Sequence, residues 1–582
     1  TAEQSSNANR SGGASTAFSK SSQFLIRGSL MSSTSAPSGS SLQQSEKKGL
    51  THVSASISFI LIFVFVGLPV WWKTTTVYRV NLPYDEIETL STQEAAHHIN
   101  IEVVPCDASS PVHEGFIKRL EEASNQDAAD LPEVSFVYKW TIREPHQNET
   151  TLFTKPLSDV DEILHRTDLF RSQDQLYVVI VPEGSAHESI TIGLHQIIYV
   201  KANKDVGVLC NNIVSAVKRY AVREGMLKRL HTSHKVTERA KLDKERMRPL
   251  SAATEFDVTF TLVVPEPQTL DVSWRIEDAV EVYLKPFLDK ISLVAKVHVR
   301  SQVLFLTSLK LRRHFNQSAN AYVATADQLS LIINPIEGST GFQASIHPVL
   351  NFVVYVVPQT HYPLYIYDDQ GNQLETNSFL SPKWGGVLFY NVAKFPGPGD
   401  ALPQPVEIDM RSVFQVFLAQ LSLLVGLPDK SYDKVVHYLD SPVPSYLDVA
   451  FLLRRRTQDY LSTSSSSLKS LSELLSKISN IVVKDEIGKL IYSSVSHAKH
   501  SFDLLNKGDL ENAFQNAEAA FLASEKAFFD PSLLALLYFP DDQKYAIYIP
   551  LFLPISLPVV MSIRGLWTYY RNRKTRKTEK QD

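Results

Sequence analysis

The fold class is decided by one stretch of the chain, FDVTFTLVVP at residues 256–265, which is apolar or β-branched at nearly every position and ends at a proline. Such a run is typical of a strand that is buried on both faces of a sheet. Further strands of this kind are predicted at 134–142, 175–182, 296–307, 351–358, 363–368 and 385–392. Helices are predicted between and after them at 207–247, 273–291 and 410–426. Strands interleaved with helices predict an α/β or α+β body around a mixed sheet.

Beyond this body, from about residue 445 to 529, the pattern becomes helical. A three- and four-residue spacing places one set of side chains on a single helix face. These are Leu468, Leu471, Leu474, Leu475, Ile478, Ile481 and Val482. Asp509 follows Gly508 and is a candidate N-cap for the next helix. We therefore expect a bundle of three or four helices, in which Ser464–Ser467 form either a loop or a closely packed small-residue face.

Composition allows several domains and excludes some classes of function. The chain has 582 residues, a formal net charge of −4 and only two cysteines, Cys106 and Cys210. That length leaves room for two or more domains, and the charge gives no basic footprint for nucleic acid. Two cysteines cannot build a zinc site by themselves, and they are either buried free thiols or one disulfide.

Two apolar segments predict membrane spans. The first is VSASISFILIFVFVGLPVWW at residues 53–72, which has no charge and is long enough to cross a bilayer as a helix. A cleaved signal peptide is the alternative, but no small-residue cleavage motif follows. The second is residues 545–563, and the basic tail after it argues against a GPI attachment signal. The excess of Lys and Arg in that tail predicts that the C-terminus is cytosolic.

With both termini cytosolic, most of the chain would lie on the other side of the membrane. Asn148 and Asn316 begin glycosylation sequons in this part, whereas a third sequon at Asn9 falls in the cytosolic tail. The expected division of the chain is as follows: a disordered Ser-rich tail at 1–52 (Met31 is a candidate start), a span at 53–72, a lumenal α/β domain at 73–440, a helical bundle at 441–530, a membrane-proximal collar at 531–544, a span at 545–563 and a basic tail at 564–582.

The sequence contains no recognisable catalytic motif: there is no GxSxG, P-loop, GxGxxG, HExxH or CxxC. His97–His98 and His113–Glu114 are metal-capable pairs that lack a third ligand at a suitable spacing. The charge run 218–250 mixes both signs and is typical of a solvated helix. We therefore expect no catalytic residue, no cofactor and no metal ligand.

Several stretches together resemble the PIG-S family, the S subunit of the GPI transamidase. They are GLPVWWKTTTVYRVNLPY (67–84), INPIE (333–337), PVLNF (348–352), SPKWGGVLFYN (381–391), KISNIVVKDEI (477–487) and FFDPSLLALLYFPDDQKYAIYIPLFLP (528–554). The resemblance implies a non-catalytic subunit in the endoplasmic reticulum membrane that supports the attachment of GPI anchors to proteins. Its implied partners are the catalytic K subunit, the T and U subunits, the amidase-like attachment subunit and membrane lipid, but no nucleic acid.

The second span contains three prolines, Pro550, Pro554 and Pro558, at a spacing that places them on one helix face. Each proline removes a backbone donor, so this face is poorly suited to lipid and suits packing against another subunit's membrane helices. A bent single anchor is the simpler alternative. Two other functions stay open on the residues alone: a membrane-tethered lumenal hydrolase, and a lumenal chaperone or tether.

Overall fold

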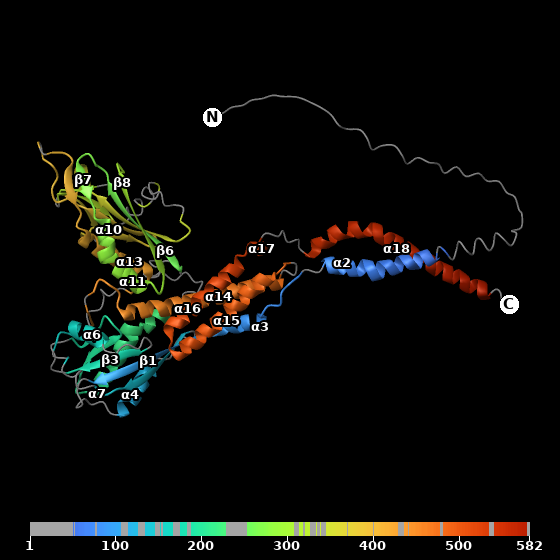
Figure 1. Ribbon diagram of the computed structural model, residues 1–582, viewed down its shortest axis with the longest axis horizontal. Coiled ribbons are helices and arrows are strands. Elements are labelled where there is room, and N and C mark those ends of the chain that lie inside the picture. Colours follow the sequence, from blue (N-terminus) through green and yellow to red (C-terminus); the bar gives the residue numbers. More distant parts are fainter. Residues whose placement is uncertain are drawn as a thin grey trace, which may run out of the picture. The chain divides into compact units, whose positions relative to one another are not determined.

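The computed structural model describes the following residues: 51, 53–75, 78–105, 114–125, 134–145, 152, 155–166, 175–182, 188–228, 253–307, 314–317, 320–325, 333, 338, 345–368, 371–397, 399, 401–428, 436–439, 441–477, 481–534 and 541–578. The chain forms two compact units (Figure 1). The smaller unit combines Thr1–Val77 with Tyr538–Asp582, and the larger one is Tyr78–Leu537.

The larger unit contains a six-stranded sheet with the order β16-β4-β5-β3-β1-β2. Its strands are β1 (Ala95–Pro105), β2 (Val134–Ile142), β3 (Gln175–Val181), β4 (Ile190–Ile192), β5 (Ile197–Lys201) and β16 (His437–Tyr438). Strands β2, β1, β3 and β5 are parallel, whereas β4 is antiparallel to β5. The apolar side chains of α4 (Glu114–Asn125), α7 (Val206–Ser215) and η3 (Ala216–Val222) pack on one face, and those of α6 (Leu157–Arg166) on the other. Both faces are buried, as the apolar strands require.

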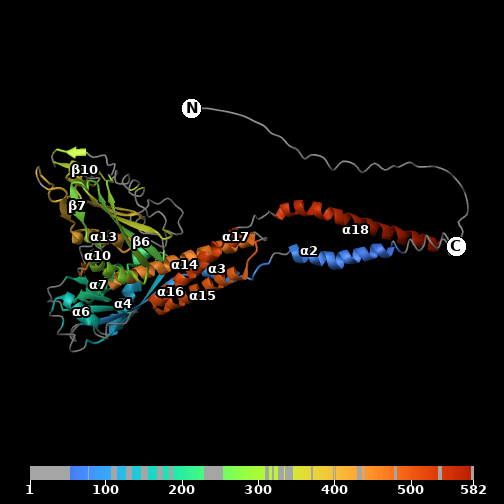
Figure 2. The same cartoon turned by 45° about the horizontal axis from the view of Figure 1, so that its top comes forward.

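A second sheet has five strands in the order β13-β14-β11-β6-β8. They are β6 (Glu255–Val264), β8 (Lys296–Phe305), β11 (Val349–Val356), β13 (Ser378–Ser381) and β14 (Gly385–Tyr390), and all but β13 are parallel. α13 (Met410–Val425) covers one face, where the rings of Phe260 and Phe414 lie 5.2 Å apart, beside α10 (Ile276–Ala279), η4 (Val280–Leu284) and α11 (Lys285–Ile291). Figure 2 shows this layer of helices below the sheet.

The opposite face packs against the three-stranded sheet β12-β10-β9 through a shared apolar cluster that includes Val263 and Ile366. The strands of this small sheet are β9 (His314–Asn316), β10 (Ala321–Thr325) and β12 (Leu364–Tyr367). A parallel pair, β7 (Leu270–Ser273) and β15 (Gln404–Glu407), and the short helix η6 (Gln359–His361) complete this half.

The remaining helices of the larger unit are α3 (Tyr84–Thr92), α14 (Tyr446–Lys477), α15 (Asp485–Lys507), α16 (Leu510–Phe528) and α17 (Pro531–Leu534). α16 packs against both α14 and α15, and the three lie side by side (Figures 1 and 2). The serine run lies inside α14 and is not a loop; Ser464 alone of the four is fully buried, and its hydroxyl lies 3.1 Å from that of Ser494 in α15. Asp509 caps α16 as predicted, because its side chain accepts from the backbone amide of Asn512.

The smaller unit is helical in its described part. It contains η1 (Phe63–Gly67), α2 (Leu68–Thr75) and α18 (Asp541–Thr578), and Pro550, Pro554 and Pro558 all lie inside α18. Among the described residues one apolar helical stretch, Val53–Val70, is long enough to cross a membrane by length and composition. The side chains of the three prolines are exposed along α18.

The mixed α/β class is confirmed, and the strands form several sheets. The predicted helix 207–247 is wrong in its continuity: Arg223 has a left-handed backbone (φ 58°) that ends η3, and its guanidinium pairs with the buried Asp448. Residues beyond 228 in that run lie outside the described part of the chain. Leu474 is 40% exposed, so it does not share the buried face of Leu471 and Leu475.

Candidate functional sites

The described thiol, Cys210, lies in the core of the first sheet. It sits on α7, is 3% exposed and belongs to the same apolar cluster as Leu209 and Ile213. Burial raises the pKa of this thiol, whereas a catalytic cysteine needs a lowered one. Cys210 is therefore a free, buried, unreactive thiol; Cys106 lies outside the described residues.

Of the two metal-capable pairs, only the side chains of His97 and His98 lie in the described part of the chain. His97 and His98 lie on β1, a strand that the sequence analysis missed, and point to opposite faces as successive strand residues do. His97 is buried and stacks on Phe136 with 5.3 Å between ring centroids. His113 lies outside the described residues, as does the side chain of Glu114.

A buried carboxylate that the sequence analysis did not single out lies in α6. Asp161 is fully buried and accepts hydrogen bonds from the Leu194 amide and the Tyr199 hydroxyl, both at 2.9 Å. Burial raises its pKa to about 6 in spite of these donors. A catalytic base must reach its substrate, and a fully enclosed carboxylate cannot. Asp161 instead fixes the 193–195 turn against α6.

Beside Asp161, two stacked imidazoles of the first α/β half lie next to the ring of Tyr446, which also contacts Lys290 of the second half. The rings of His165 and His195 lie 3.6 Å apart, and Nε2 of His195 lies 3.5 Å from Glu162. From the other half, Nζ of Lys290 lies 4.2 Å from the ring centroid of Tyr446 at the start of α14. Burial, together with the charges of His165 and Lys290, lowers the pKa of His195 to about 4. The imidazole of His195 is therefore neutral at physiological pH and serves packing.

A groove of about 760 Å³ runs along α13 and the segment before α14. Its walls include Tyr283, Arg411, Leu418, Leu423 and Val443, and none of its lining residues is histidine or cysteine. Such walls can contact an apolar or extended partner segment, and without a histidine the groove offers no Ser–His or Cys–His pair.

Of the two sequon asparagines expected in the lumen, the structure describes one. Asn316 ends β9, at the edge of the three-stranded sheet, and its side chain is half-buried. Asn148 lies outside the described residues.

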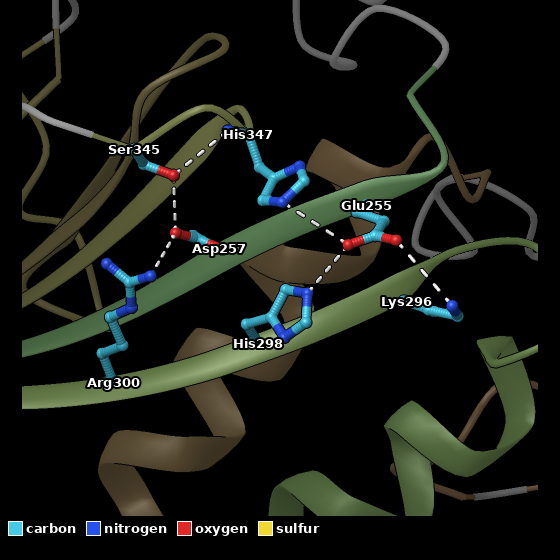
Figure 3. Close-up of polar contacts among 7 residues, drawn as sticks. All are labelled: Glu255, Asp257, Lys296, His298, Arg300, Ser345 and His347. Atoms are coloured by element: carbon cyan, nitrogen blue, oxygen red, sulfur yellow. Dashed lines mark hydrogen bonds and ion pairs between the residues drawn. The ribbon is translucent and has the colours of Figure 1, made fainter.

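A polar cluster on the second sheet was also missed by the sequence analysis. Glu255 begins β6, His298 lies near the start of β8, and His347 lies just before β11 (Figure 3). Nε2 of His298 and Nε2 of His347 lie 3.0 and 3.5 Å from the same oxygen, Oε2 of Glu255. The hydrogen bond from His298 lowers the pKa of Glu255, so the carboxylate is ionised.

Comparison with known proteins covers nearly the whole chain. The sequence model of the family "PIG-S: Phosphatidylinositol-glycan biosynthesis class S protein" matches residues 58–573. The GPI-anchor transamidase component PIGS of Homo sapiens is 34% identical over 548 residues, covering 91% of this chain and 97% of that protein. The bovine protein of the same name is 33% identical over 547 residues, with the same coverage. GPI transamidase component GPI17 of Saccharomyces cerevisiae is 23% identical over 539 residues, covering 89% of this chain and 92% of that protein. The chain therefore belongs to the PIG-S family.

Proposed function

We propose that this protein is a subunit of the GPI transamidase complex in the endoplasmic reticulum membrane, where it supports the attachment of GPI anchors without performing the chemistry itself. One observation carries the proposal: relatives named as GPI-anchor transamidase components align with 91% of this chain and 97% of their own length. The family match over residues 58–573 includes the second apolar segment, most of the first and the body between them.

The non-catalytic role is supported by the described chemistry. Cys210 has a raised pKa in an apolar core, and Asp161 is fully enclosed. The groove along α13 has no histidine or cysteine among its lining residues. These observations disfavour the alternative of a membrane-tethered hydrolase, whose nucleophile and base must meet at an accessible surface.

We further propose two membrane spans with both termini in the cytosol. Val53–Val70 provides the first, and the apolar segment 545–563 within α18 provides the second. The sequence after α18's apolar segment is rich in Lys and Arg, which supports a cytosolic C-terminus. The intervening body, with its α14–α16 helices acting as a bundle, would then lie in the lumen.

The proposed partners are the catalytic K subunit, the T and U subunits and the amidase-like attachment subunit. Within the membrane, we assign the face formed by Pro550, Pro554 and Pro558 to packing against their helices, because a helix face that lacks backbone donors gains from protein rather than lipid neighbours. In the lumen, the groove along α13 is the surface we assign to a partner segment.

The test is co-purification of the other subunits with the tagged chain in mild detergent. Replacing all three prolines by leucine should leave membrane insertion intact and reduce the recovered partner subunits severalfold. The matched control replaces Ile549, Ser556 and Ile563, which lie on the opposite face of α18, by leucine and should leave recovery unchanged.

If the proline variant recovers the partner subunits as the wild type does, the three prolines only bend the helix and do not contact a partner. The wider proposal fails if the wild-type chain recovers no transamidase subunits, or if the purified chain alone hydrolyses substrates. Protease protection of a C-terminal tag in sealed microsomes would contradict the two-span topology.

A further inference from the structure

The cluster of Glu255, His298 and His347 brings three donor groups from three separate segments to one point on the second sheet. All their candidate ligand atoms lie within 4.8 Å of one another. Figure 3 shows both imidazoles directed at the carboxylate of Glu255. The three residues lie at the amino ends of neighbouring parallel strands, on the face opposite α13, so the sheet itself determines their spacing.

The distances match those between ligand atoms that share one metal ion. Zinc binds imidazole nitrogen and carboxylate oxygen at about 2.0–2.2 Å in a tetrahedron, which places neighbouring ligand atoms about 3.3 Å apart. The two nitrogens lie 3.0 and 3.5 Å from Oε2 of Glu255. An ion could enter between them with small side-chain movements and without a change of backbone.

A second layer of contacts holds the segment that carries His347. Asp257, two residues along β6 from Glu255, is 1% exposed and accepts a hydrogen bond from the Ser345 hydroxyl at 2.7 Å. The Ser345 oxygen in turn accepts from the backbone amide of His347 at 3.1 Å. Arg300 pairs with the same Asp257 oxygen at 3.1 Å. Hydrogen-bonded supports of this kind orient the ligands of metal sites.

One neighbouring charge opposes a cation here. Nζ of Lys296 lies 3.8 Å from Glu255, but it approaches the other carboxylate oxygen, Oε1. The Lys296 side chain is 76% exposed, so it can withdraw into solvent and leave Oε2 to the ion. The imidazole side chains of His298 and His347 are 49% and 29% exposed, which leaves an entry path from solvent.

We propose that Glu255, His298 and His347 bind one divalent transition metal ion of the zinc class. Two imidazole nitrogens and a carboxylate oxygen favour such an ion over calcium or magnesium, which prefer all-oxygen ligands. Three protein ligands leave a fourth position for water. Ligand sites of α/β sheets that serve catalysis lie at the carboxyl ends of the strands, whereas this cluster lies at the amino ends. The ion therefore acts as a clamp that joins β6, β8 and the segment entering β11.

The test uses the full chain in detergent without a histidine tag, after chelation and removal of the chelator. Titration with zinc chloride should show one saturable site by calorimetry, and saturating zinc should raise the unfolding temperature. Titration with cobalt chloride should give the visible absorption bands of a four-coordinate ion with nitrogen and oxygen ligands.

Glu255→Gln and the double variant His298→Gln/His347→Gln should weaken zinc binding by more than about 100-fold, and Ser345→Ala by about 10-fold through loss of positioning. The matched controls are Glu266→Gln and His361→Gln, at the opposite end of the same sheet, which should bind as wild type. Absence of a saturable site in the wild-type chain, a cobalt spectrum of hydrated ion only, or undiminished binding by Glu255→Gln would each overturn the proposal. The cobalt measurement on the wild type decides the question even if the variants do not fold.

Discussion

Replacing Asp161 by asparagine should change how the stability of the first sheet depends on pH. The carboxylate is fully buried and has a pKa of about 6 instead of 3.8, with burial as the main cause. A carboxyl with a raised pKa in the folded state binds its proton more tightly there than in the unfolded chain. Its contribution to stability is therefore present at low pH and lost as pH rises from 3.8 through about 6.

The magnitude follows from these two pKa values. Between pH 7.5 and pH 5, proton uptake by Asp161 should add about 1.4 kcal/mol to the free energy of unfolding of the wild type. Asp161→Asn keeps the shape of the side chain but cannot take up this proton. When the pH is lowered from 7.5 to 5, the free energy of unfolding of the variant should therefore fall by about 1.4 kcal/mol relative to that of the wild type.

Hydrogen exchange followed by mass spectrometry can measure this difference locally, in peptides covering β3 and β5, after correction for the intrinsic effect of pH on exchange. Asp159→Asn is the control, because Asp159 lies exposed on the same helix, and its difference from wild type should be the same at both pH values. An Asp161→Asn difference that is equal at pH 5 and pH 7.5 would refute the reasoning.

Three further outcomes are expected, each measurable as a change in the unfolding free energy or unfolding temperature of the detergent-solubilised chain. The fold favours the neutral form of His195, whose pKa is lowered from 6.5 to about 4, so acidification destabilises the wild type. The free energy of unfolding of His195→Gln should therefore rise relative to that of the wild type by up to about 2 kcal/mol when the pH is lowered from 7.5 to 5. An equal difference at both pH values would contradict this. Tyr460→Phe should raise the free energy of unfolding by about 1 kcal/mol, because the fully buried Tyr460 hydroxyl has no hydrogen-bond partner among the described residues. A loss of stability would show that this hydroxyl does make a hydrogen bond. Gly385→Ala should lower the free energy of unfolding by more than about 3 kcal/mol, because Gly385 has φ +142° and an added Cβ would lie 1.8 Å from the Asn351 carbonyl oxygen. A loss under about 1 kcal/mol would show that β11 and β14 can move apart at this position.

The strands that the sequence predicts closely are those with continuous β-branched and aromatic runs, whether they are buried on both faces, as β3 and β6 are, or partly exposed, as β2 is. β2, β3, β6, β11 and β14 agree with their predicted ranges to within two residues at each end, because continuous β-branched and aromatic runs leave no other element plausible. β1 was missed because AAHHINIEVVP mixes histidine, asparagine and glutamate into its length, and its polar residues find places only once the neighbouring strands and helices are present. Such tertiary compensation is invisible to a local pattern.

The candidate metal cluster could not have been predicted for a related reason. Glu255, His298 and His347 are far apart in the sequence and form no short motif. Only the parallel register, which pairs Glu255 with Lys296 and brings β11 alongside β6, places them together. A search for polar residues at the starts of predicted parallel strands would have found two of the three.

The last strand of the first sheet comes from a distant part of the chain. β16 adds to the edge of β4, and the backbone continues this pairing where the Leu439 amide donates to the Ile192 carbonyl at 3.1 Å. During synthesis, β16 can pair with β4 only after all strands of the second sheet have emerged from the ribosome, because β16 follows them in the chain. Open strand edges attract foreign chains. Until β16 pairs with it, the edge of β4 is therefore open to pairing with other chains, and truncations that end before residue 437 should aggregate or be degraded more readily than the full chain.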